Sequence, residues 1–393
     1  MHLEEIRALE KRYVMQTYGR NEIALVSGEG ARLRDSEGKE YIDLTSGIGV
    51  NCLGYHHPAL SAAISDQAQK LMHCSNLFYS EPMAQVAEHL VKSTGLSRVF
   101  FANSGAEANE AMIKTARKYS SDRYGKDRYK IITLRQSFHG RTMTTLMATG
   151  QDKFHQYFYP LPEGFAYVEA GDLAKFKSCA DEHVCAVIME MIQGEGGVLP
   201  LDQAFVQEVS AYCKAHDILV CVDEVQTGIG RTGTLFCYEQ YGIEPDIVSM
   251  AKGLGGGVPI GAILCGEKCA DTLQPGQHGS TFGGNLLACR AAQTVLSVVD
   301  QPQFLASVKE KGEYIREQLL AMHSPAIREV RGMGLMLGIG VDPQKRSDYV
   351  RALQEKGVLV LTAGEDTIRL LPPLVITKED IDQALACMKE VLK

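Results

Sequence analysis

The stretch Ser249-Met250-Ala251-Lys252-Gly253-Leu254-Gly255-Gly256-Gly257 places a single lysine among small residues. Upstream, the apolar run Leu219-Val220-Cys221-Val222-Asp223-Glu224 ends in two acids. Small neighbours leave room for a bulky group to approach the amine of Lys252. In open α/β sheets, ligands bind beyond the carboxyl ends of the strands, and Asp223 lies at such an end. The two stretches predict an α/β fold with a lysine and a carboxylate at one site.

A lysine and a strand-end acid at one site indicate a pyridoxal 5'-phosphate (PLP) cofactor. Lys252 would form a Schiff base with the aldehyde of PLP. Asp223 would hold the ring nitrogen protonated, so that the ring accepts electrons from the substrate.

The composition is that of an ordinary globular protein. The chain has 393 residues, of which 45% are hydrophobic and 22% charged, and its formal net charge is -8. This balance indicates neither nucleic acid nor an anionic membrane as a partner. No apolar run approaches the ~20 residues that span a bilayer. The 11 cysteines are scattered without a Cys-x-x-Cys motif, and the first residues are polar and acidic, so we expect reduced thiols and a cytoplasmic location.

Short β-rich runs alternate with helical patterns through the middle of the chain. Because these runs are apolar throughout, they predict a mostly parallel sheet that is covered on both faces. Residues 31–44 read as a hairpin around an Asp-Ser-Glu-Gly turn. We predict three parts: residues 1–50 as an N-terminal segment, 51–295 as a large domain, and 296–393 as a small α+β domain. The runs that we interpret as strands are 98–102, 130–134, 184–189 and 218–222, with 334–341 and 367–371 in the small domain.

The motif Asn103-Ser104-Gly105-Ala106-Glu107-Ala108-Asn109 lies between a predicted strand and a helix. The first N–H groups of a helix have no intrahelical partner and favour an anion, so Ser104, Gly105 and Ala106 are candidate phosphate ligands. A capping box, in which Ser104 caps and Glu107 reaches back, explains the same residues without a ligand.

Phe138-His139-Gly140-Arg141-Thr142 follows the predicted strand at 130–134. Phe138 is able to stack on a flat ring, and Arg141 is able to bind a carboxylate through two hydrogen bonds. An ordinary turn with a surface arginine is the alternative, and His139 fits either interpretation.

Three further segments carry candidate ligand groups. Glu195 lies in a glycine-rich loop, Thr281 in a flexible hydroxyl-bearing loop, and Arg369 in an apolar strand where its charge requires a partner. Residues 228–233 match the dinucleotide pattern G-x-G-x-x-G, which would indicate a nicotinamide dehydrogenase. That pattern normally opens a helix directly after a strand, and residues 223–227 intervene here.

The ordered set of a phosphate-binding turn, an aromatic residue, a strand-end acid and a lysine resembles the class III (ornithine-type) aminotransferases of PLP fold type I. The resemblance covers nearly the whole chain, from Tyr41-Ile42-Asp43 to Leu371-Pro372-Pro373. It implies a large domain with a mostly parallel seven-stranded sheet flanked by helices, plus a small α+β domain. Gly47-Ile48-Gly49-Val50-Asn51 and Ser75-Asn76-Leu77-Phe78-Tyr79 are most similar to the acetylornithine branch of the class.

The resemblance also implies a role for each candidate. Lys252 would carry the cofactor and move the proton, Asp223 would pair with the pyridine nitrogen, and Gln226 would bind the phenolic oxygen. Thr281 would reach the phosphate of the neighbouring subunit, which implies a homodimer with shared active sites. The other candidates divide into cofactor ligands (Ser104, Gly105, Ala106, Phe138) and substrate ligands (Arg141, Glu195, Ser280, Arg369).

The implied reaction moves the terminal amino group of N-acetylornithine to 2-oxoglutarate, giving glutamate and N-acetylglutamate semialdehyde, as in arginine biosynthesis. Glycine at position 47 fits a donor with an acetylated α-amine, because ornithine enzymes tend to have a tyrosine near this position. The alternatives are a sister transaminase for succinylornithine, ornithine or 4-aminobutyrate, and a non-catalytic PLP-binding protein.

Overall fold

A computed structural model describes all 393 residues, and a seven-stranded sheet lies at its centre. The strand order is β4-β12-β11-β10-β7-β5-β6. Only β12 runs antiparallel to its neighbours, so the prediction of a mostly parallel sheet is confirmed. The strands are β4 (Arg98–Ala102), β5 (Lys130–Leu134), β6 (Phe165–Val168), β7 (Val184–Met189), β10 (Leu219–Asp223), β11 (Ile247–Met250) and β12 (Gly261–Cys265).

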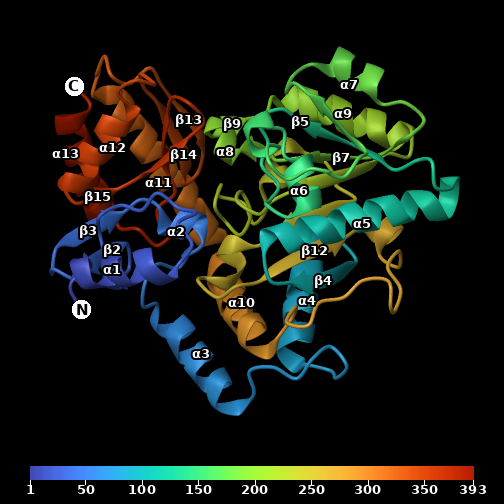
Figure 1. Cartoon of the computed structure of the whole chain (residues 1–393), viewed down its shortest axis with the longest axis horizontal. Helices are drawn as coiled ribbons and strands as arrows, with labels where there is room; N and C mark the ends of the chain where they lie inside the picture. Colours follow the sequence, from blue (N-terminus) through green and yellow to red (C-terminus); the bar gives the residue numbers. More distant parts are fainter.

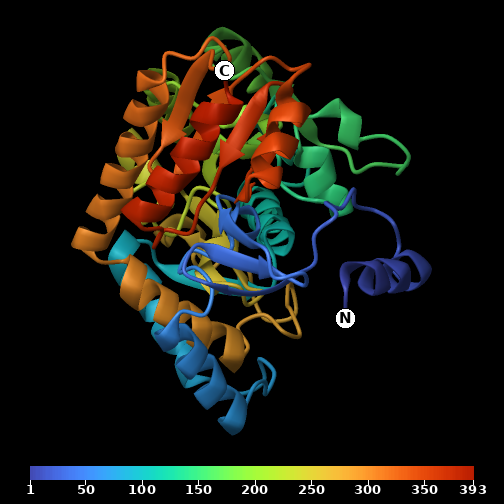
Figure 2. The same ribbon diagram turned by 90° about the vertical axis from the view of Figure 1, so that its left-hand side faces the viewer.

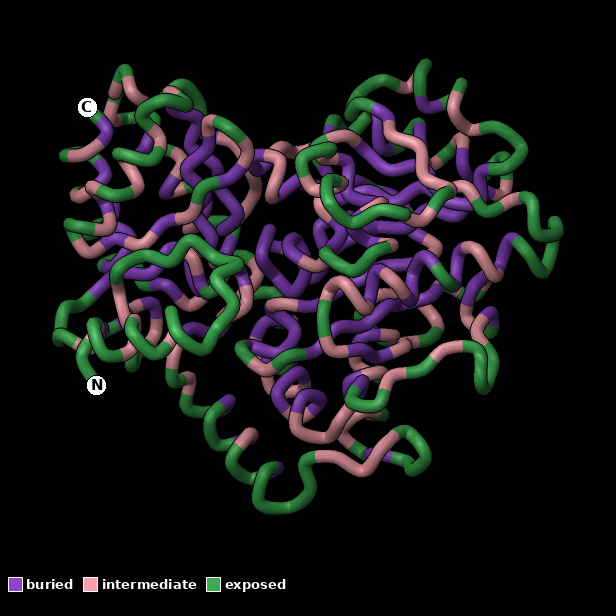
Figure 3. The backbone as a smooth tube through the Cα atoms, in the orientation of Figure 1, coloured by how far each residue is buried: buried purple, intermediate pink, exposed green.

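The strands are apolar throughout because both faces of the sheet are covered. In β10, Leu219 and Cys221 belong to one hydrophobic cluster, whereas Val220 and Val222 belong to another. This alternation is the period-two pattern of a strand with a core on each side. Helix α5 packs on one of these cores, and Figure 3 shows the buried chain running through the sheet.

Most of the helices between residues 58 and 299 lie around this sheet, whereas α3 (Pro58–Lys70) projects away from it and packs against α10 (Leu286–Val299) (Figure 1). The others are α4 (Glu81–Thr94), α5 (Gly105–Tyr124), α6 (Met143–Ala148), α7 (Leu173–Cys179) and α9 (Gln203–Ala215). Shorter elements are α8 (Gly194–Gly197), the strands β8 (Ile192–Gln193) and β9 (Leu199–Pro200), and the 3-10 turns η1 (Asp152–Phe154), η2 (Cys237–Tyr241), η3 (Lys252–Gly255) and η4 (Glu267–Cys269).

The two ends of the chain share a sheet. The hairpin predicted at residues 31–44 is confirmed, since β2 and β3 pair antiparallel. Strand β15 from the C-terminal part then pairs in parallel with β3, joining Val358 to Ile42. In Figure 1 the blue N-terminal strands accordingly lie beside the red C-terminal elements. This sheet consists of β1 (Leu25–Glu29), β2 (Arg32–Asp35), β3 (Glu40–Asp43) and β15 (Val358–Leu359).

A further four-stranded sheet and three helices complete the C-terminal part. The strands are β13 (Glu329–Met333), β14 (Met336–Gly340), β16 (Leu361–Ala363) and β17 (Thr367–Leu370), in the order β13-β14-β17-β16. The helices are α11 (Pro302–Ala321), α12 (Arg346–Glu355) and α13 (Lys378–Val391). The two strands that the sequence predicts here, at 334–341 and 367–371, correspond to β14 and β17.

Helix α1 (Leu3–Tyr13) stands apart from this body and buries none of its residues (Figure 2). The short α2 (Ser46–Gly49) follows β3. No helix combines the length and the apolar character that a membrane crossing requires. All 11 cysteines are free thiols, and most are buried.

Candidate active site

One cavity of about 410 Å³ opens at the carboxyl ends of the parallel strands. Of the twelve predicted site residues, eight line it: Ser104, Gly105, Ala106, Phe138, Arg141, Asp223, Gln226 and Lys252. The other four are Glu195, Ser280, Thr281 and Arg369. Three of these bind residues that line the cavity, whereas Thr281 lies outside it.

Lys252 lies two residues beyond the end of β11, after Ala251, and is the first residue of the turn η3. Its φ of 42° lies in the left-handed region, where a residue with a side chain is strained. Burial lowers the pKa of the Lys252 amine, and the positive charge of Arg369 adds to this effect. A lowered pKa raises the share of neutral amine, which is the nucleophilic form.

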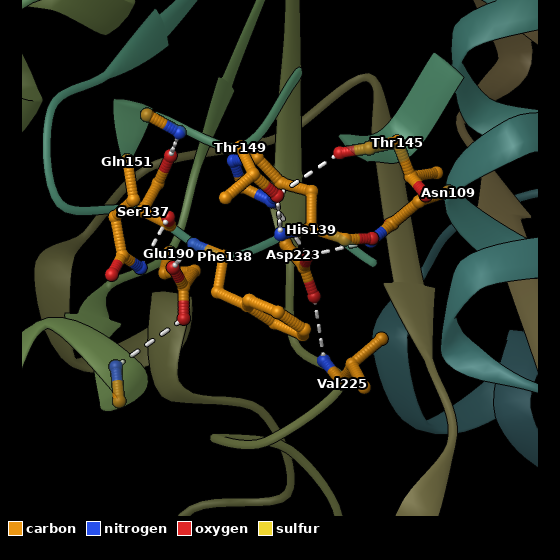
Figure 4. A network of polar contacts seen from close by, with 12 residues as sticks. Asn109, Ser137, Phe138, His139, Thr145, Thr149, Gln151, Glu190, Asp223 and Val225 are labelled. Carbon is orange, nitrogen blue, oxygen red and sulfur yellow. Dashed lines mark hydrogen bonds and ion pairs between the residues drawn. The ribbon is translucent and has the colours of Figure 1, made fainter. Parts of the chain in front are cut away.

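Asp223 ends β10 with both carboxylate oxygens bound (Figure 4). Its Oδ2 accepts from Asn109 Nδ2 at 2.7 Å and from His139 Nδ1 at 2.8 Å, and its Oδ1 accepts from Val225 N at 3.0 Å. These three donors fix the orientation of the carboxylate. Although burial lowers it, the hydrogen bond and the charge of Asp223 raise the pKa of His139 above its ordinary value.

Helix α5 begins at Gly105, at the edge of the cavity. Gly105 and Ala106 are its first two residues, so their N–H groups have no intrahelical partner. Ser104 caps the helix by accepting from Glu107 N at 3.2 Å, and the Glu107 carboxylate accepts from Asn103 N at 2.9 Å. The capping interpretation is confirmed, and it is compatible with anion binding because the cap leaves the first amides free.

Arg141 is exposed and forms no ion pair with an acid of this chain. Its guanidinium carbon lies 4.2 Å from the centre of the Phe154 ring and 5.7 Å from that of Phe138. The rings hold the guanidinium without satisfying its hydrogen-bond donors. Arg141 is thus prepared to bind a carboxylate from outside the chain.

Arg369, in contrast to Arg141, is buried and already paired with an acid. Its side chain is 3% exposed, and its Nη1 binds Glu195 Oε1 at 2.6 Å and Gln226 Oε1 at 3.1 Å. Burial raises the pKa of Glu195, but the charge and the hydrogen bond of Arg369 outweigh it and hold that pKa below its usual value. Gly194 makes room for this cluster, since a Cβ there would lie 2.4 Å from Gln226 Oε1.

Ser280 and Thr281 lie beside each other but differ in their contacts. Ser280 Oγ accepts from Asn103 Nδ2 at 3.1 Å and from Gly283 N at 2.9 Å, which links it to the cavity through Asn103. Thr281 is exposed and forms no hydrogen bond in this chain. Within a single chain, Thr281 does not contribute to the site.

Four residues of the site were not predicted as members. Asn109 and His139 belong to motifs that the sequence had singled out, yet only the fold shows that both bind Asp223. Glu190 follows β7 and lines the cavity; its position directly after an apolar strand was a usable signal. Phe154 lies well along the chain from Arg141, and no sequence pattern indicates their contact.

The G-x-G-x-x-G match at residues 228–233 forms turns and opens no helix. It carries the buried Arg231, whose Nη1 donates to the carbonyl oxygens of Leu335 and Pro372. The pattern therefore joins two parts of the fold and does not form the dinucleotide-binding turn of a nicotinamide enzyme.

Comparison with known proteins agrees with this geometry. The model of the family described as "Aminotransferase class-III" matches residues 13–392. The chain belongs to the class-III aminotransferases. This family depends on PLP, and the cavity suits that cofactor. The free helix amides are able to bind an anion, Phe138 offers a ring face, and Asp223 and Lys252 supply the charge and the amine.

Individual relatives cover the whole chain. The acetylornithine aminotransferase of Haemophilus ducreyi is 50% identical over 394 residues, covering 100% of this chain and 99% of that protein. The crystal structure of N-acetylornithine aminotransferase from Stenotrophomonas maltophilia has a TM-score of 0.84 at 38% identity, with 98% and 97% of the two chains covered. The ornithine aminotransferase of Toxoplasma gondii has a TM-score of 0.96 at 32% identity, covering 100% of this chain and 95% of that one.

Proposed function

We propose that this class-III aminotransferase transfers the terminal amino group of N-acetylornithine to 2-oxoglutarate, giving N-acetylglutamate semialdehyde and glutamate. The observation that carries the proposal is the pair of unlike arginines, with Arg141 free and Arg369 masked by Glu195. Relatives of 44–50% identity that are named acetylornithine aminotransferases support the donor. The reaction places the protein in arginine biosynthesis, and we infer a cytoplasmic location.

The residues of the cavity have separate roles in holding the cofactor and in moving protons. When bound, PLP supplies an aldehyde that takes up the amino group and a ring that accepts electrons. The Lys252 amine would hold the cofactor and then move a proton at the reacting carbon of the substrate. Asp223 would hold a proton on the ring nitrogen, and Gln226 would donate to the phenolic oxygen. Phe138 would cover one face of the ring, while Ser104, Gly105 and Ala106 would bind the phosphate.

The two arginines explain how one site takes two unlike substrates. Arg141 binds the α-carboxylate that N-acetylornithine, 2-oxoglutarate and glutamate share. Arg369 binds the second carboxylate of glutamate and of 2-oxoglutarate. While acetylornithine occupies the site, Glu195 pairs with Arg369, because an unpaired buried cation would disfavour an apolar or cationic substrate chain.

A donor panel tests this assignment. The purified protein should be yellow, and kcat/KM for N-acetylornithine should exceed that for ornithine by at least about tenfold, which is ~1.4 kcal/mol. Succinylornithine and 4-aminobutyrate complete the panel, with 2-oxoglutarate saturating. Lys252→Ala should fold and lose nearly all turnover. Ornithine as the best donor would move the protein to the ornithine branch, and a Lys252→Ala variant with full turnover would contradict the PLP assignment.

We further propose a homodimer in which Thr281 reaches the partner's site, while Ser280 and the partner subunit border the mouth of the site. The face around Thr281 is apolar and exposed: Phe282 is 60% exposed, Leu77 88% and Phe78 65%. Asn76 fixes this surface by donating to the carbonyls of Ser280 and Gly283. Large exposed apolar patches commonly mark interfaces.

Mixed dimers test the shared site. In a dimer of one Lys252→Ala chain and one Thr281→Ala chain, sharing leaves one site with both changes and the other site intact. Mixing should therefore restore activity above that of the Thr281→Ala homodimer. If the activity of the mixture is only the average of the activities of the two homodimers, each chain uses its own Thr281 or none.

We also retain the three-part division into residues 1–50, 51–295 and 296–393 as a proposal. The pairing of β3 with β15 supports grouping the first segment with the C-terminal part. Limited proteolysis would test this division, because the first cuts should fall near the two boundaries between the parts.

A further inference from the structure

Glu190 is a buried acid at the cavity, and the reaction described above gives it no role. It directly follows β7 and is 5% exposed. Its Oε1 accepts from Phe138 N at 2.8 Å, and its Oε2 accepts from Gly194 N at 3.3 Å. In Figure 4 its carboxylate lies next to the backbone of Phe138, with a second dashed line leading away from the other oxygen. One carboxylate thus binds two separate loops.

Each of these loops carries one function of the site. Phe138 presents its ring to the cavity. Gly194 opens the turn α8, and the next residue is Glu195, which pairs with Arg369 at 2.6 Å. Gln193 adds a second tether between the same regions, donating from Nε2 to Arg135 O at 2.7 Å. Of the two tethers, Glu190 is the one that lines the cavity.

An acid at this position is costly to bury. No cation forms an ion pair with Glu190, and two neutral N–H donors are its only hydrogen-bond partners. Burial raises its pKa to about 7, while the nearby His139 opposes this effect. A glutamine would match one N–H with its oxygen but would turn an NH₂ group toward the other N–H. The carboxylate is therefore the side chain of this length that serves both loops.

We propose that Glu190 is a positioning residue that fixes the Phe138 loop and the Glu195 turn relative to each other. The placement of the ring-stacking face and the pairing of Glu195 with Arg369 are then set by one carboxylate. This inference rests on the proposed function, since it assigns Glu190 to the choice between the two substrates.

The proposal makes the two Michaelis constants respond differently. Loosening the turn weakens the Glu195–Arg369 pair, which is needed while the amino donor is bound. The KM for N-acetylornithine should therefore rise. The KM for 2-oxoglutarate should stay level or fall, because that substrate requires Arg369 to be free. A general loss of structure would raise both constants.

The test compares Glu190→Gln and Glu190→Asp with Glu224→Gln as holoenzymes. Glu224 is a suitable control because it is also a buried acid at a strand end, with a pKa raised by burial to about 7. It faces away from the cavity, accepting from Tyr238 N at 2.8 Å and from Thr227 Oγ1. Glu190→Asp keeps the charge but is one methylene too short to reach both amides.

Both Glu190 variants should raise the KM for N-acetylornithine, by roughly tenfold for Glu190→Gln, without raising that for 2-oxoglutarate. Both should also lose visible circular dichroism per bound PLP, because the ring environment is less fixed. Should one variant fail to fold, the other decides. Values equal to those of Glu224→Gln, or two constants that rise together, would overturn the proposal. If the wild type does not use N-acetylornithine, the proposed function fails, while the dichroism comparison still tests the tether to Phe138.

Discussion

At the residue scale, the two arginines of the site have identical side chains, but their surroundings give them different properties. Arg141 lies among aromatic rings and keeps its donors free, whereas Arg369 is buried and bound to Glu195. A buried cation requires a partner, and an exposed one does not. One site therefore holds an arginine whose donors are free and another arginine that already has a partner.

Substitution of each arginine should separate the two half-reactions. Arg141→Ala should weaken both, because every substrate carries an α-carboxylate. Arg369→Ala should mainly damage the half with glutamate and 2-oxoglutarate. Loss of a charge-assisted contact costs roughly 2–5 kcal/mol, or ~30-fold and upward in apparent binding. Single-turnover measurements of each half decide, and equal damage from Arg369→Ala to both halves would refute the masking of Arg369 by Glu195.

Glu224 should make stability depend on pH. Its pKa is about 7 in the folded state because it is buried, against an ordinary value of 4.5. The folded state then holds more protons between these values, so its contribution to stability falls as the pH rises from 4.5 to 7. The Glu224→Gln variant has no such titrating group. Its free energy of unfolding should therefore rise relative to that of the wild type by roughly 3 kcal/mol between pH 4.5 and pH 7. Urea unfolding at pH 5 and pH 8 measures the difference; an offset that does not change with pH would contradict the buried, protonated state.

Sequence reasoning identified the residues that sit in short, ordered motifs. Asp223 ends a strand, Lys252 and Phe138 come a few residues after one, and the strand ends of a parallel sheet meet at one edge. The position of Glu190 directly after β7 was a signal that it lies at the site, but the loops that it joins could not be predicted, and Phe154 gave no signal at all. Their roles depend on which loops lie side by side, and one apolar strand with an acid after it resembles any other.

At the element scale, the start of helix α5 packs closely against the loop that follows β10. A Cβ on Gly105 would lie 2.6 Å from Cγ1 of Val225, which is closer than side chains approach. The glycine thus lets the helix amides and the loop after β10 line the same cavity. The strand order itself was only partly predictable, because the apolar pattern of β12 does not reveal that it runs antiparallel.

Gly105→Ala should therefore displace the first turn of α5 or the Val225 side chain. The phosphate-binding amides would move, and the affinity for PLP should fall by at least about tenfold, or ~1.4 kcal/mol. Titration of the apoprotein with PLP measures this. Gly19→Ala is the matched control, since nothing lies within 4 Å of a Cβ there. Unchanged affinity in Gly105→Ala would separate the helix start from phosphate binding.

At the scale of the whole molecule, Arg231 joins three parts of the chain. It is fully buried, donates to the carbonyls of Leu335 and Pro372, and its Nη2 lies 3.4 Å from Ser46 Oγ. Burial lowers the pKa of Arg231 to about 10. The contacts link the loop after β10 to the C-terminal part and to the N-terminal segment.

Arg231→Leu should leave these carbonyls without donors and lower the free energy of unfolding by roughly 2–5 kcal/mol. Thermal unfolding of the holoenzyme measures the loss as a lower Tm. Arg98→Leu is the control, because Arg98 is exposed and pairs only with Asp271 at the surface, where the change costs about 0.5 kcal/mol or less. Equal Tm values for the two variants would show that the contacts of Arg231 with the N-terminal segment and the C-terminal part do not stabilise the fold.

The pairing of β3 with β15 has a consequence for synthesis on the ribosome. Val358 must emerge before it can meet Ile42, so this sheet stays open until most of the chain has been made. Meanwhile the strands of the seven-stranded sheet, which end at Cys265, are already complete. Contacts between distant residues form slowly, because a long loop must close first. The edge of β3 that pairs with β15 therefore stays without its partner for most of translation, and residues 358–359 complete a sheet whose other strands lie within residues 25–43.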